Sequence, residues 1–516
     1  MAQAKVIIVG AGIGGLTSAA LLAAQGCDVT VCEAASGPGG KARQDVHDGV
    51  GIDAGPTVFT KRATFEAIFE ACGGSLDDHL TLTPAEVLAR HAWNEDERLD
   101  LFADPQASED AIAAFAGPDD ARGYARFRVA AKRAHDTLDD SFMRNTKTTP
   151  WGLAARIGPR RMADMVAIRP MQTLWPVLGS YFKDPRLHQL FGRYATYCGA
   201  SPFQASATLM LIAHVEAEGV WLIDGGLSAL ARALEALGCS NGVHYRYDSA
   251  VAEITVEQGK ASGVALASGE RINADRVVLN ADPAALASGL FGTSAGSAVP
   301  AYAPKDRSLS AVTFLGNVLA TGFDLSHHNV FFSNDYRAEF DALANGQLAE
   351  RPSVYLCAQD HKPGAPPPTG NERVQIIINA PANGDTHHYS GQEIDQCRAH
   401  MLEALKTAGL TLDGPLHATT PTDFNARYPA TGGALYGRAS HGWAASFRRP
   451  GARTTIPGLY CAGGGTHPGA GVPMAALSGQ LAAASLMTDL VSTRRFHPVA
   501  MAGGMSMQSA PTTSSG

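Results

Sequence analysis

Three glycines with fixed spacing near the start of the chain could bind phosphate groups. Gly10, Gly12 and Gly15 form a G-x-G-x-x-G pattern, and the carboxylate Glu33 follows after the next apolar run. In such a turn the first glycine permits the tight bend, the second lets backbone N–H groups approach a pyrophosphate, and the third lets a helix pack on the strand. A carboxylate at the end of the second strand binds ribose hydroxyls and disfavours a 2′-phosphate. The combination predicts a dinucleotide site that excludes NADP.

The elements around these glycines have the order that such a site requires. Residues 5–9 (KVIIV) predict a buried parallel strand, residues 16–26 a helix that stops at Gly26, and residues 28–34 a second strand. A glycine-rich structural turn would also fit the glycines alone, but it does not account for Glu33. The uncharged run 6–27 could also indicate a membrane span or a signal peptide, but its four glycines between positions 10 and 15 argue against both.

A second strand–glycine–helix pattern lies near the other end of the chain. Residues 461–479 read CAGGGTHPGAGVPMAALSG, with seven glycines and no charged side chain. Residues 457–462 predict a short strand, and a helix is expected to start near Val472–Met474. Backbone without side chains lets another group approach closely. One long cofactor would need both patterns, so we expect a binding domain that is discontinuous in sequence.

Composition excludes some classes of function. The chain has 516 residues, 17% of them charged, and a net charge of −8, which argues against a nucleic-acid-binding protein. The eight cysteines are scattered and form no C-x-x-C pair, as is typical of reduced thiols in a cytoplasmic protein. The adjacent pairs His327–His328 and His387–His388 lack the i, i+4 spacing of a helical metal site, so no metal site is expected.

The remainder of the chain differs in character from one stretch to the next. Residues 58–142 predict mixed helices and loops, including two helices separated at Gly117–Pro118. Residues 144–193 hold nine lysines and arginines but two acids, interleaved with Trp151, Trp175 and methionines, which suits helices lying on an anionic bilayer surface. An ordinary helical subdomain with solvated cations is the alternative. Residues 249–283 predict a meander of strands, residues 300–450 a sheet-based domain, and residues 493–516 a disordered tail.

Three segments resemble a known family. The continuation ASGPGGKAR after Glu33, and Asp53–Thr57 (DAGPT), resemble the FAD-containing amine oxidase and carotenoid desaturase superfamily. The segment GLYCAGGGTHPGAGVPMAALSG is similar to that of the bacterial-type phytoene dehydrogenases and carotenoid desaturases, and the resemblance covers about residues 5–490. It implies an α/β fold with a discontinuous Rossmann-like FAD-binding domain, a mixed-sheet substrate domain and a helical membrane-associating subdomain.

The resemblance also implies a division of the chain and a set of contacts to FAD. The FAD-binding parts would be residues 1–80, 221–300 and 451–492, the helical part residues 81–220 and the substrate sheet residues 301–450. The helix that starts near Val472 would direct its N-terminus at the flavin ring, and Val251 would meet the adenine. The residues expected to contact non-covalently bound FAD are Gly10, Gly12, Ile13, Gly14, Gly15, Glu33, Ala34, Gly40, Lys41, Arg43, Gly55, Pro56, Thr57, Val251, Gly464, Gly465, Gly471, Val472 and Met474.

The implied chemistry needs few acid–base side chains. The expected reaction is formation of a C3–C4 double bond in an acyclic 1-hydroxy or methoxy carotenoid such as 1-hydroxyneurosporene, with hydride transfer to the flavin N5. Quinone or oxygen would regenerate FAD, and the enzyme would lie at the cytoplasmic membrane surface. Candidates for a proton acceptor or a substrate-hydroxyl contact are Tyr197, His214, Glu216 and Glu218. His467 could be catalytic, but a structural role in the turn before Pro468 is favoured.

Three alternatives stay open at this point. A phytoene desaturase would share every motif, because the end of the substrate tunnel is not visible in sequence. A carotenoid isomerase on the same scaffold would leave the number of double bonds unchanged. An FAD amine oxidase would share the N-terminal motif and release peroxide with amines, although its flavin segment usually lacks the T-H-P-G run.

Overall fold

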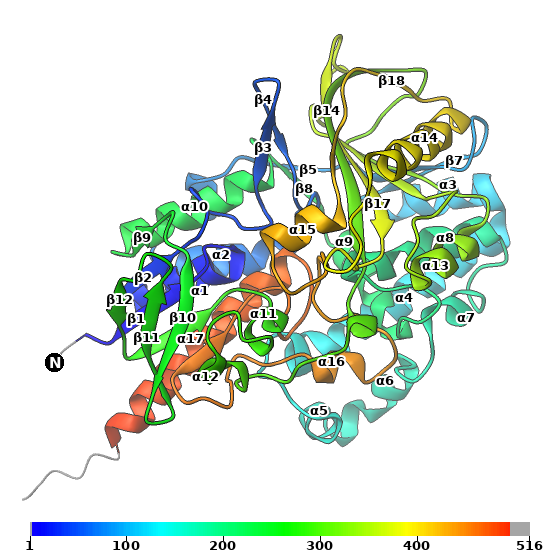
Figure 1. The fold of residues 1–516 in the computed structure, drawn as a ribbon. Coiled ribbons are helices and arrows are strands. Elements are labelled where there is room, and N and C mark those ends of the chain that lie inside the picture. Colours follow the sequence, from blue (N-terminus) through cyan, green and yellow to red (C-terminus); the bar gives the residue numbers. More distant parts are fainter. Residues whose placement is uncertain (1–2, 496–516) are drawn as a thin grey trace, which may run out of the picture.

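The computed structural model describes residues 3–495, and a five-stranded parallel sheet lies at the centre of one half of the molecule (Figure 1). Its strands lie in the order β20–β13–β1–β2–β9. They come from three separate stretches of sequence, so the expectation of a discontinuous domain is confirmed. Their bounds are β1 (Lys5–Val9), β2 (Asp28–Cys32), β9 (His244–Arg246), β13 (Arg276–Leu279) and β20 (Leu459–Cys461).

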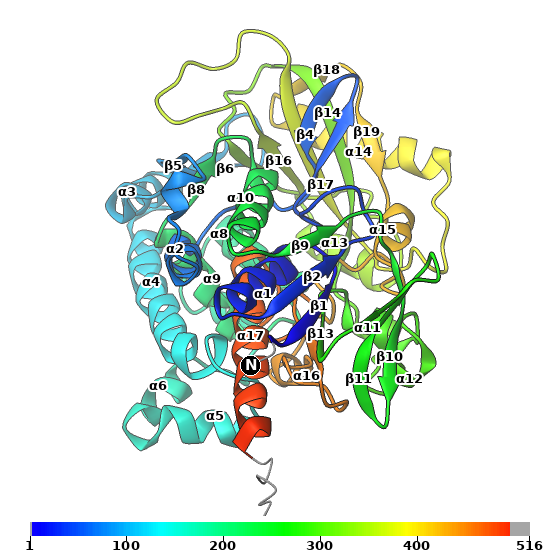
Figure 2. The same ribbon diagram turned by 90° about the vertical axis from the view of Figure 1, so that its left-hand side faces the viewer.

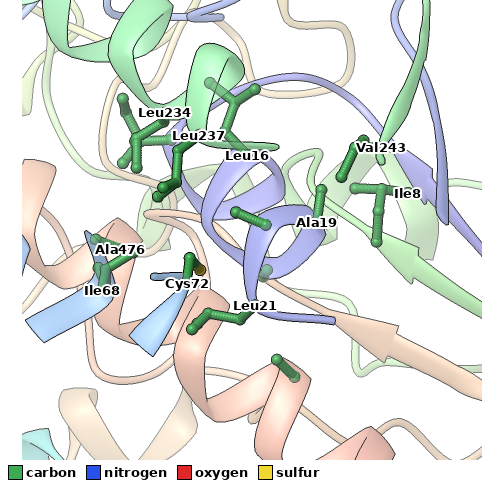
Figure 3. Close-up of a cluster of buried hydrophobic side chains, with 14 of the residues drawn as sticks. Ile8, Leu16, Ala19, Leu21, Ile68, Cys72, Leu234, Leu237, Val243 and Ala476 are labelled. Atoms are coloured by element: carbon green, nitrogen blue, oxygen red, sulfur yellow. The ribbon is translucent and has the colours of Figure 1, made fainter. Parts of the chain in front are cut away.

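Both faces of this sheet are covered, which explains why β1 is apolar at successive positions. Val6 and Ile8 pack against four helices, whereas Ile7 and Val9 pack against a three-stranded antiparallel sheet and two short helices. Figure 3 shows the helical layer, where Leu16 meets Leu234 and Leu237. The four helices are α1 (Ile13–Ala24), α2 (Arg62–Ala71), α10 (Leu227–Ser240) and α17 (Val472–Arg495); the opposite layer is β10 (Val251–Glu257), β11 (Lys260–Leu266), β12 (Arg271–Asn273), α11 (Pro283–Ala287) and α12 (Thr293–Gly296).

The first and last helices of the domain cross at small residues. A Cβ at Gly479 would lie 2.5 Å from the carbonyl oxygen of Gly14, so the two backbones approach too closely for side chains. The hydroxyl of Ser18 donates to the carbonyls of Gly14 and Gly479 at 2.8 and 3.1 Å. This crossing joins the two ends of the sequence into one layer.

A large, mostly antiparallel sheet forms the second half of the molecule (Figure 2). Its strand order is β18–β14–β17–β16–β15–β6–β7, with β19 also pairing with β14. One face packs on α14 and the other on the helical part. The bounds are β6 (Val87–Ala92), β7 (Arg98–Phe102), β14 (Ser310–Thr321), β15 (His328–Phe331), β16 (Val354–Ala358), β17 (Glu372–Ala380), β18 (Thr411–Asp413), β19 (His417–Thr419) and α14 (Gly391–Thr407).

The sequence analysis is wrong about residues 82–102. That stretch was expected to be helix and loop within the helical part, but it forms β5 (Leu82–Pro84) and the hairpin β6–β7. β6 pairs in parallel with β15, whose residues lie more than two hundred positions later in the chain. A strand whose partner is so distant has a local sequence signal too weak to separate it from a loop.

The helical part contains α3 to α9. The two helices predicted on either side of Gly117–Pro118 are present as α3 and α4. In both views α5 and α6 lie at the end of the molecule opposite to the β3–β4 hairpin (Figures 1 and 2). The bounds are α3 (Pro105–Ala116), α4 (Pro118–Leu138), α5 (Pro150–Ile157), α6 (Met162–Ala167), α7 (Leu174–Leu178), α8 (Pro185–Gly192) and α9 (Leu211–Ala217).

The remaining elements connect these layers. They are β3 (Gln44–His47), β4 (Val50–Asp53), β8 (Trp221–Ile223), α13 (Tyr336–Ala344), α15 (Pro421–Arg427) and α16 (Ala445–Arg448). β8 pairs with β5 and follows the end of the helical part.

Residues 6–27 form a strand, a turn and a buried helix, so the decision against a membrane span at that position is confirmed. α17 is long and apolar enough to cross a membrane by length and composition alone, but it packs on α1 in the core. It extends to Arg495, three residues into the predicted tail. The rest of that tail, residues 496–516, lies outside the described residues.

Candidate functional site

The glycine turn between β1 and α1 is built by close approaches of backbone. Gly10 has a φ of +98°, and a Cβ at Gly15 would lie 2.1 Å from the carbonyl oxygen of Gly10. Gly12 is the residue before α1, so the first N–H groups of the helix have no partner within it. These N–H groups and the positive end of the helix dipole favour an anion at this turn.

Asn280, at the end of β13, fills the space that the glycines leave. Its Nδ2 lies 3.4 Å from the carbonyl oxygen of Gly10. A Cβ at Gly12 would lie 2.6 Å from Nδ2 of Asn280, and a Cβ at Gly14 would lie 2.7 Å from Oδ1 of the same side chain. Sequence reasoning ended the meander at this residue and did not assign it to the site. The signal was present, because an amide follows directly on a buried apolar strand.

The Glu33 carboxylate lies at the carboxyl end of β2 and faces the glycine turn. It accepts hydrogen bonds from the backbone N–H groups of Ala11 (2.6 Å) and Ala35 (2.8 Å). The backbone of Glu33 also pairs with Arg246 and Ser249, so the chain that leads into Val251 runs beside it. The exposed Ala34 lies between these contacts.

A second glycine pair stacks on the first turn. The N–H of Gly39 donates to the carbonyl of Ala11 at 2.8 Å, and a Cβ at Gly40 would lie 3.2 Å from Cα of Gly12. Gly55 in turn lies against this loop, since its Cβ would be 1.8 Å from the carbonyl oxygen of Lys41. The loop Gly55–Pro56–Thr57 is therefore held directly beside the glycine pair.

The two cations of this loop are engaged by protein groups. The Lys41 ammonium donates to the carbonyl of Leu435 at 2.6 Å, and burial lowers its pKa although the nearby Asp282 acts in the opposite direction. Arg43 forms a bidentate ion pair with Asp45. Both side chains therefore hold the loop in place through contacts with other parts of the protein.

The C-terminal glycine segment joins this site from the other end of the chain. β20 leads to Gly463, whose N–H donates to the Ser478 hydroxyl at 2.7 Å, and α17 starts at Val472, as the sequence predicts. A Cβ at Gly14 would lie 2.7 Å from the backbone nitrogen of Gly463, so the two glycine segments touch. A Cβ at Gly464 would meet nothing within 4 Å. Open space therefore lies at Gly464, beside the contact between the two glycine segments.

A buried arginine supports the C-terminal segment. Arg449 is 2% exposed and donates to the carbonyls of Gly464 (3.0 Å) and Tyr436 (2.9 Å). Burial lowers its pKa, and the nearby Asp282 carboxylate opposes that effect. A Cβ at Gly465 would lie 3.1 Å from the same carboxylate. No sequence motif marks Arg449, because its partners are backbone carbonyls of distant loops.

Residues at the start of α17 contact both the parallel-sheet domain and the helical part. Val472 is buried in the core of the dinucleotide domain, Gly471 has a φ of +108°, and Met474 packs on the core of the helical part. The predicted contacts of these residues with FAD stay predictions, since the structure contains protein alone.

Two of the candidate catalytic residues lie together in a buried polar network. Glu216 is 3% exposed and accepts hydrogen bonds from the hydroxyls of Tyr194 and Tyr197. Arg193 donates to the Tyr197 hydroxyl at 2.8 Å and lies over the ring of Tyr355. Burial raises the pKa of Glu216, although Arg193 and the two tyrosine hydroxyls oppose the shift.

This network reaches the loop beside the glycine pair. The Tyr355 hydroxyl donates to Oγ1 of Thr57 at 2.7 Å and also contacts Nδ1 of His328 at 2.7 Å. The structure therefore brings Tyr197 and Glu216 to the same region as Gly55–Thr57, through Arg193 and Tyr355. Neither Arg193 nor Tyr355 was singled out from the sequence.

The other candidates lie elsewhere or are engaged. His214 points away from Glu216; its Nε2 lies 3.4 Å from the Glu218 carboxylate, and its ring contacts that of His135. The Nε2 of His467 contacts the carbonyls of Phe142 (3.0 Å) and Asn145 (2.9 Å). These contacts tie the glycine segment to the stretch that follows α4, which supports the structural role favoured for His467.

The fold also collects groups that could bind a metal ion. The ligand atoms of His327, His328 and Cys357 lie within 4.8 Å of one another, as do those of His135, Asp136 and His214. The first group forms because His328 and Cys357 are directly opposed on β15 and β16. Sequence spacing, which argued against a metal site, does not detect such cross-strand pairs.

Comparisons with known proteins agree with this architecture. The model of the family described as flavin containing amine oxidoreductase matches residues 13–487. The hydroxyneurosporene desaturase of Rubrivivax gelatinosus is 48% identical over 98% of both chains, and that of Cereibacter sphaeroides is 45% identical over 95% of this chain and 99% of its own. The solved structure of putrescine oxidase bound to putrescine has a TM-score of 0.57 at 16% identity and covers 94% of this chain and 99% of that one.

Proposed function

Because the chain belongs to the flavin containing amine oxidoreductase family and, within it, to the carotenoid desaturases, we propose that it forms the C3–C4 double bond of acyclic 1-hydroxy or 1-methoxy carotenoids. It is an FAD-dependent oxidoreductase. The observation that carries the proposal is the contact between the two glycine segments, Gly10–Gly15 and Gly463–Gly471, which makes one site for a long cofactor.

The residues of the two glycine segments fit FAD. The N-termini of α1 and α17 lie beside each other, the Glu33 carboxylate adjoins the glycine turn and would bind the ribose, and open space lies at Gly464. When bound, FAD supplies an acceptor for the hydride and its two electrons. The glycine N–H groups would hold its phosphates, and the first turn of α17 would offer partial positive charge to the flavin ring.

The substrate region would bind the polyene and exclude water. Removing two hydrogens from adjacent carbons also releases a proton, which needs an acceptor. Among the candidates, Glu216 is the buried carboxylate that adjoins Thr57 through Arg193 and Tyr355. We propose that the Tyr197–Glu216 pair receives this proton. Burial raises the pKa of Glu216, which makes its carboxylate a stronger base than an exposed one.

The alternatives are less well supported. The relatives with 45–48% identity are named hydroxyneurosporene desaturases, whereas the likeness to putrescine oxidase, at 16% identity, shows the fold alone. A phytoene desaturase remains the nearest rival, because it differs in the substrate end and not in the cofactor site. Quinone or oxygen is proposed as the electron acceptor.

The end of the molecule formed by α5 and α6 is proposed to lie on a membrane surface at the cytoplasmic side. Trp151 is 85% exposed, Val166 71% and Met171 68%. The positive charge of this region supports attraction to an anionic membrane less than the sequence suggests, because several of its cations form ion pairs. Arg144 pairs with Asp139, and Lys183 pairs with Asp119. Exposed apolar side chains are therefore the main support for this proposal.

The test of the function is a product analysis. The purified protein would be reconstituted with FAD in liposomes that contain 1-hydroxyneurosporene or, separately, phytoene. We expect a loss of two hydrogens by mass and a red-shifted absorption spectrum with the hydroxylated substrate alone. Conversion of phytoene would move the assignment to the early desaturases, and an isomer of unchanged mass would contradict desaturation.

A further inference from the structure

A small cavity lies beside the loop that is expected to face the flavin. It has a volume of about 100 Å³ and is bounded by residues 53–57, by β8 and by the ends of β15 and β16. Phe59, Leu222 and Trp221 form apolar walls. The polar groups that line it include Asp53, Thr57, His327, Cys357 and Gln359. A space of this size holds several water molecules or the branched end of an alkyl chain.

The ring of His327 presents a hydrogen-bond acceptor at this cavity. Its Nδ1 lies 2.9 Å from the carbonyl oxygen of His361, which can only accept, so Nδ1 carries the proton. With the proton on Nδ1, the lone pair of the neutral ring is on Nε2. That lone pair faces the Cys357 thiol at 3.5 Å, a weak donor.

Two oxygens complement this nitrogen. Oγ1 of Thr57 accepts from Tyr355, which leaves the threonine's own proton available to donate. Asp53 is 7% exposed, and its Oδ2 accepts from the N–H of Ser228 at the start of α10. The Thr57 hydroxyl is therefore a donor at this cavity, and Nε2 of His327, whose partner is the weak thiol donor of Cys357, is an acceptor.

We propose that this cavity binds the tertiary hydroxyl of the substrate, with the O–H donating to Nε2 of His327 and accepting from the Thr57 hydroxyl. The inference rests on the proposed function. A hydroxyl on C1 is three bonds from C3, so it must lie within a few ångströms of the bond that is oxidised. Its binding site must then adjoin the flavin loop, and this cavity is lined by Pro56 and Thr57 of that loop.

The test compares 1-hydroxyneurosporene with neurosporene, the matched hydrocarbon without the hydroxyl. His327→Leu removes the acceptor, whereas His327→Gln keeps an acceptor near the position of Nε2. We expect the ratio of kcat/KM for the two substrates to fall at least about tenfold in His327→Leu and to stay within about threefold of wild type in His327→Gln. His400→Leu, on α14 and away from the cavity, is the matched control.

A binding measurement separates this inference from the proposed function. Tryptophan fluorescence of the FAD-loaded protein, without an electron acceptor, would report binding of each polyene, since Trp221 lines the cavity. If wild type binds the hydroxylated polyene more tightly than the hydrocarbon and His327→Leu loses this preference, the subsite is supported. If neither compound is desaturated, only the proposed function is overturned. An unchanged preference in His327→Leu, with normal flavin absorbance, would overturn the subsite.

Discussion

The dinucleotide-binding region and the substrate region of this molecule present different chemical groups to their ligands. Around Gly10–Gly15 and Gly463–Gly471 the exposed groups are backbone N–H groups, and side chains such as Asn280 and Arg449 hold that backbone in place. In the substrate region the groups are side chains: Thr57, His327 and Glu216, which come from a loop, a strand end and a helix. A backbone site needs a contiguous glycine pattern, whereas a side-chain site can be assembled from anywhere in the chain.

The largest effect should come from adding one methyl group to the backbone site. Gly15→Ala would place a Cβ 2.1 Å from the carbonyl oxygen of Gly10, so the turn must shift. We expect a variant that retains almost no flavin and loses about 3 kcal/mol of unfolding free energy. Flavin absorbance per protein and urea denaturation measure the two effects.

Gly37→Ala is the matched control, because a Cβ there meets nothing within 4 Å. It should bind flavin as the wild type does. If Gly15→Ala bound flavin equally well, the close approach of the backbone would not be what the site requires.

The membrane-facing end of the substrate region should respond to loss of its apolar side chains. A triple variant with Trp151→Ser, Val166→Ser and Met171→Ser should bind liposomes about thirtyfold more weakly, because each side chain loses apolar area that the bilayer would bury. Co-sedimentation with anionic liposomes measures this affinity, and activity in detergent should stay close to wild type. Val46→Ser, at a 68% exposed position on the opposite hairpin, is the control. Equal binding of the triple variant would place the membrane contact elsewhere.

The carboxylate of the backbone site should have a moderate effect. Glu33→Gln would replace one acceptor oxygen by an N–H₂ group, which would face the backbone N–H of Ala11 or Ala35. We expect the Kd for FAD to rise about tenfold, because the variant loses about one charge-assisted hydrogen bond. Fluorescence titration of the apoprotein measures the Kd, with Glu70→Gln on the exposed side of α2 as control. An unchanged Kd would show that Glu33 has no part in binding.

The smallest effect should be a pH dependence from the side-chain site. Burial raises the pKa of Glu216 above its value in the unfolded chain, so the folded state binds this proton more tightly. The contribution of Glu216 to stability is therefore full below about pH 4.3 and is lost as the pH rises through the folded pKa. The unfolding free energy of wild type relative to Glu216→Gln should fall over that range.

Urea denaturation between pH 4 and 8 measures this difference. Glu350→Gln, at an exposed position in the loop before β16, is the control. A difference that rises with pH would mean that Arg193 stabilises the charged form more than burial opposes it.

The sequence alone was sufficient for the backbone site. The run KVIIV, the glycines at 10, 12 and 15 and Glu33 lie within one βαβ unit, and the strand and helix that follow Pro457 repeat the pattern. The order of these residues predicts the strand, the turn and the helix, although the contacts that require Gly12 and Gly14 to be glycine come from Asn280 and Gly463, far along the chain. The break between α3 and α4 at Gly117–Pro118 was predictable from a local glycine–proline signal.

The tertiary structure alone decided the side-chain site. The parallel pairing of β6 with β15, far along the chain, has no local sequence signal, and His327, Cys357 and Thr57 meet only after the sheet has formed. Buried polar side chains are positioned by packing and hydrogen bonds between distant segments, which leave no periodic signal in the sequence. The glycine pattern thus predicted a dinucleotide site, and the folded sheet determined which polar groups lie beside it.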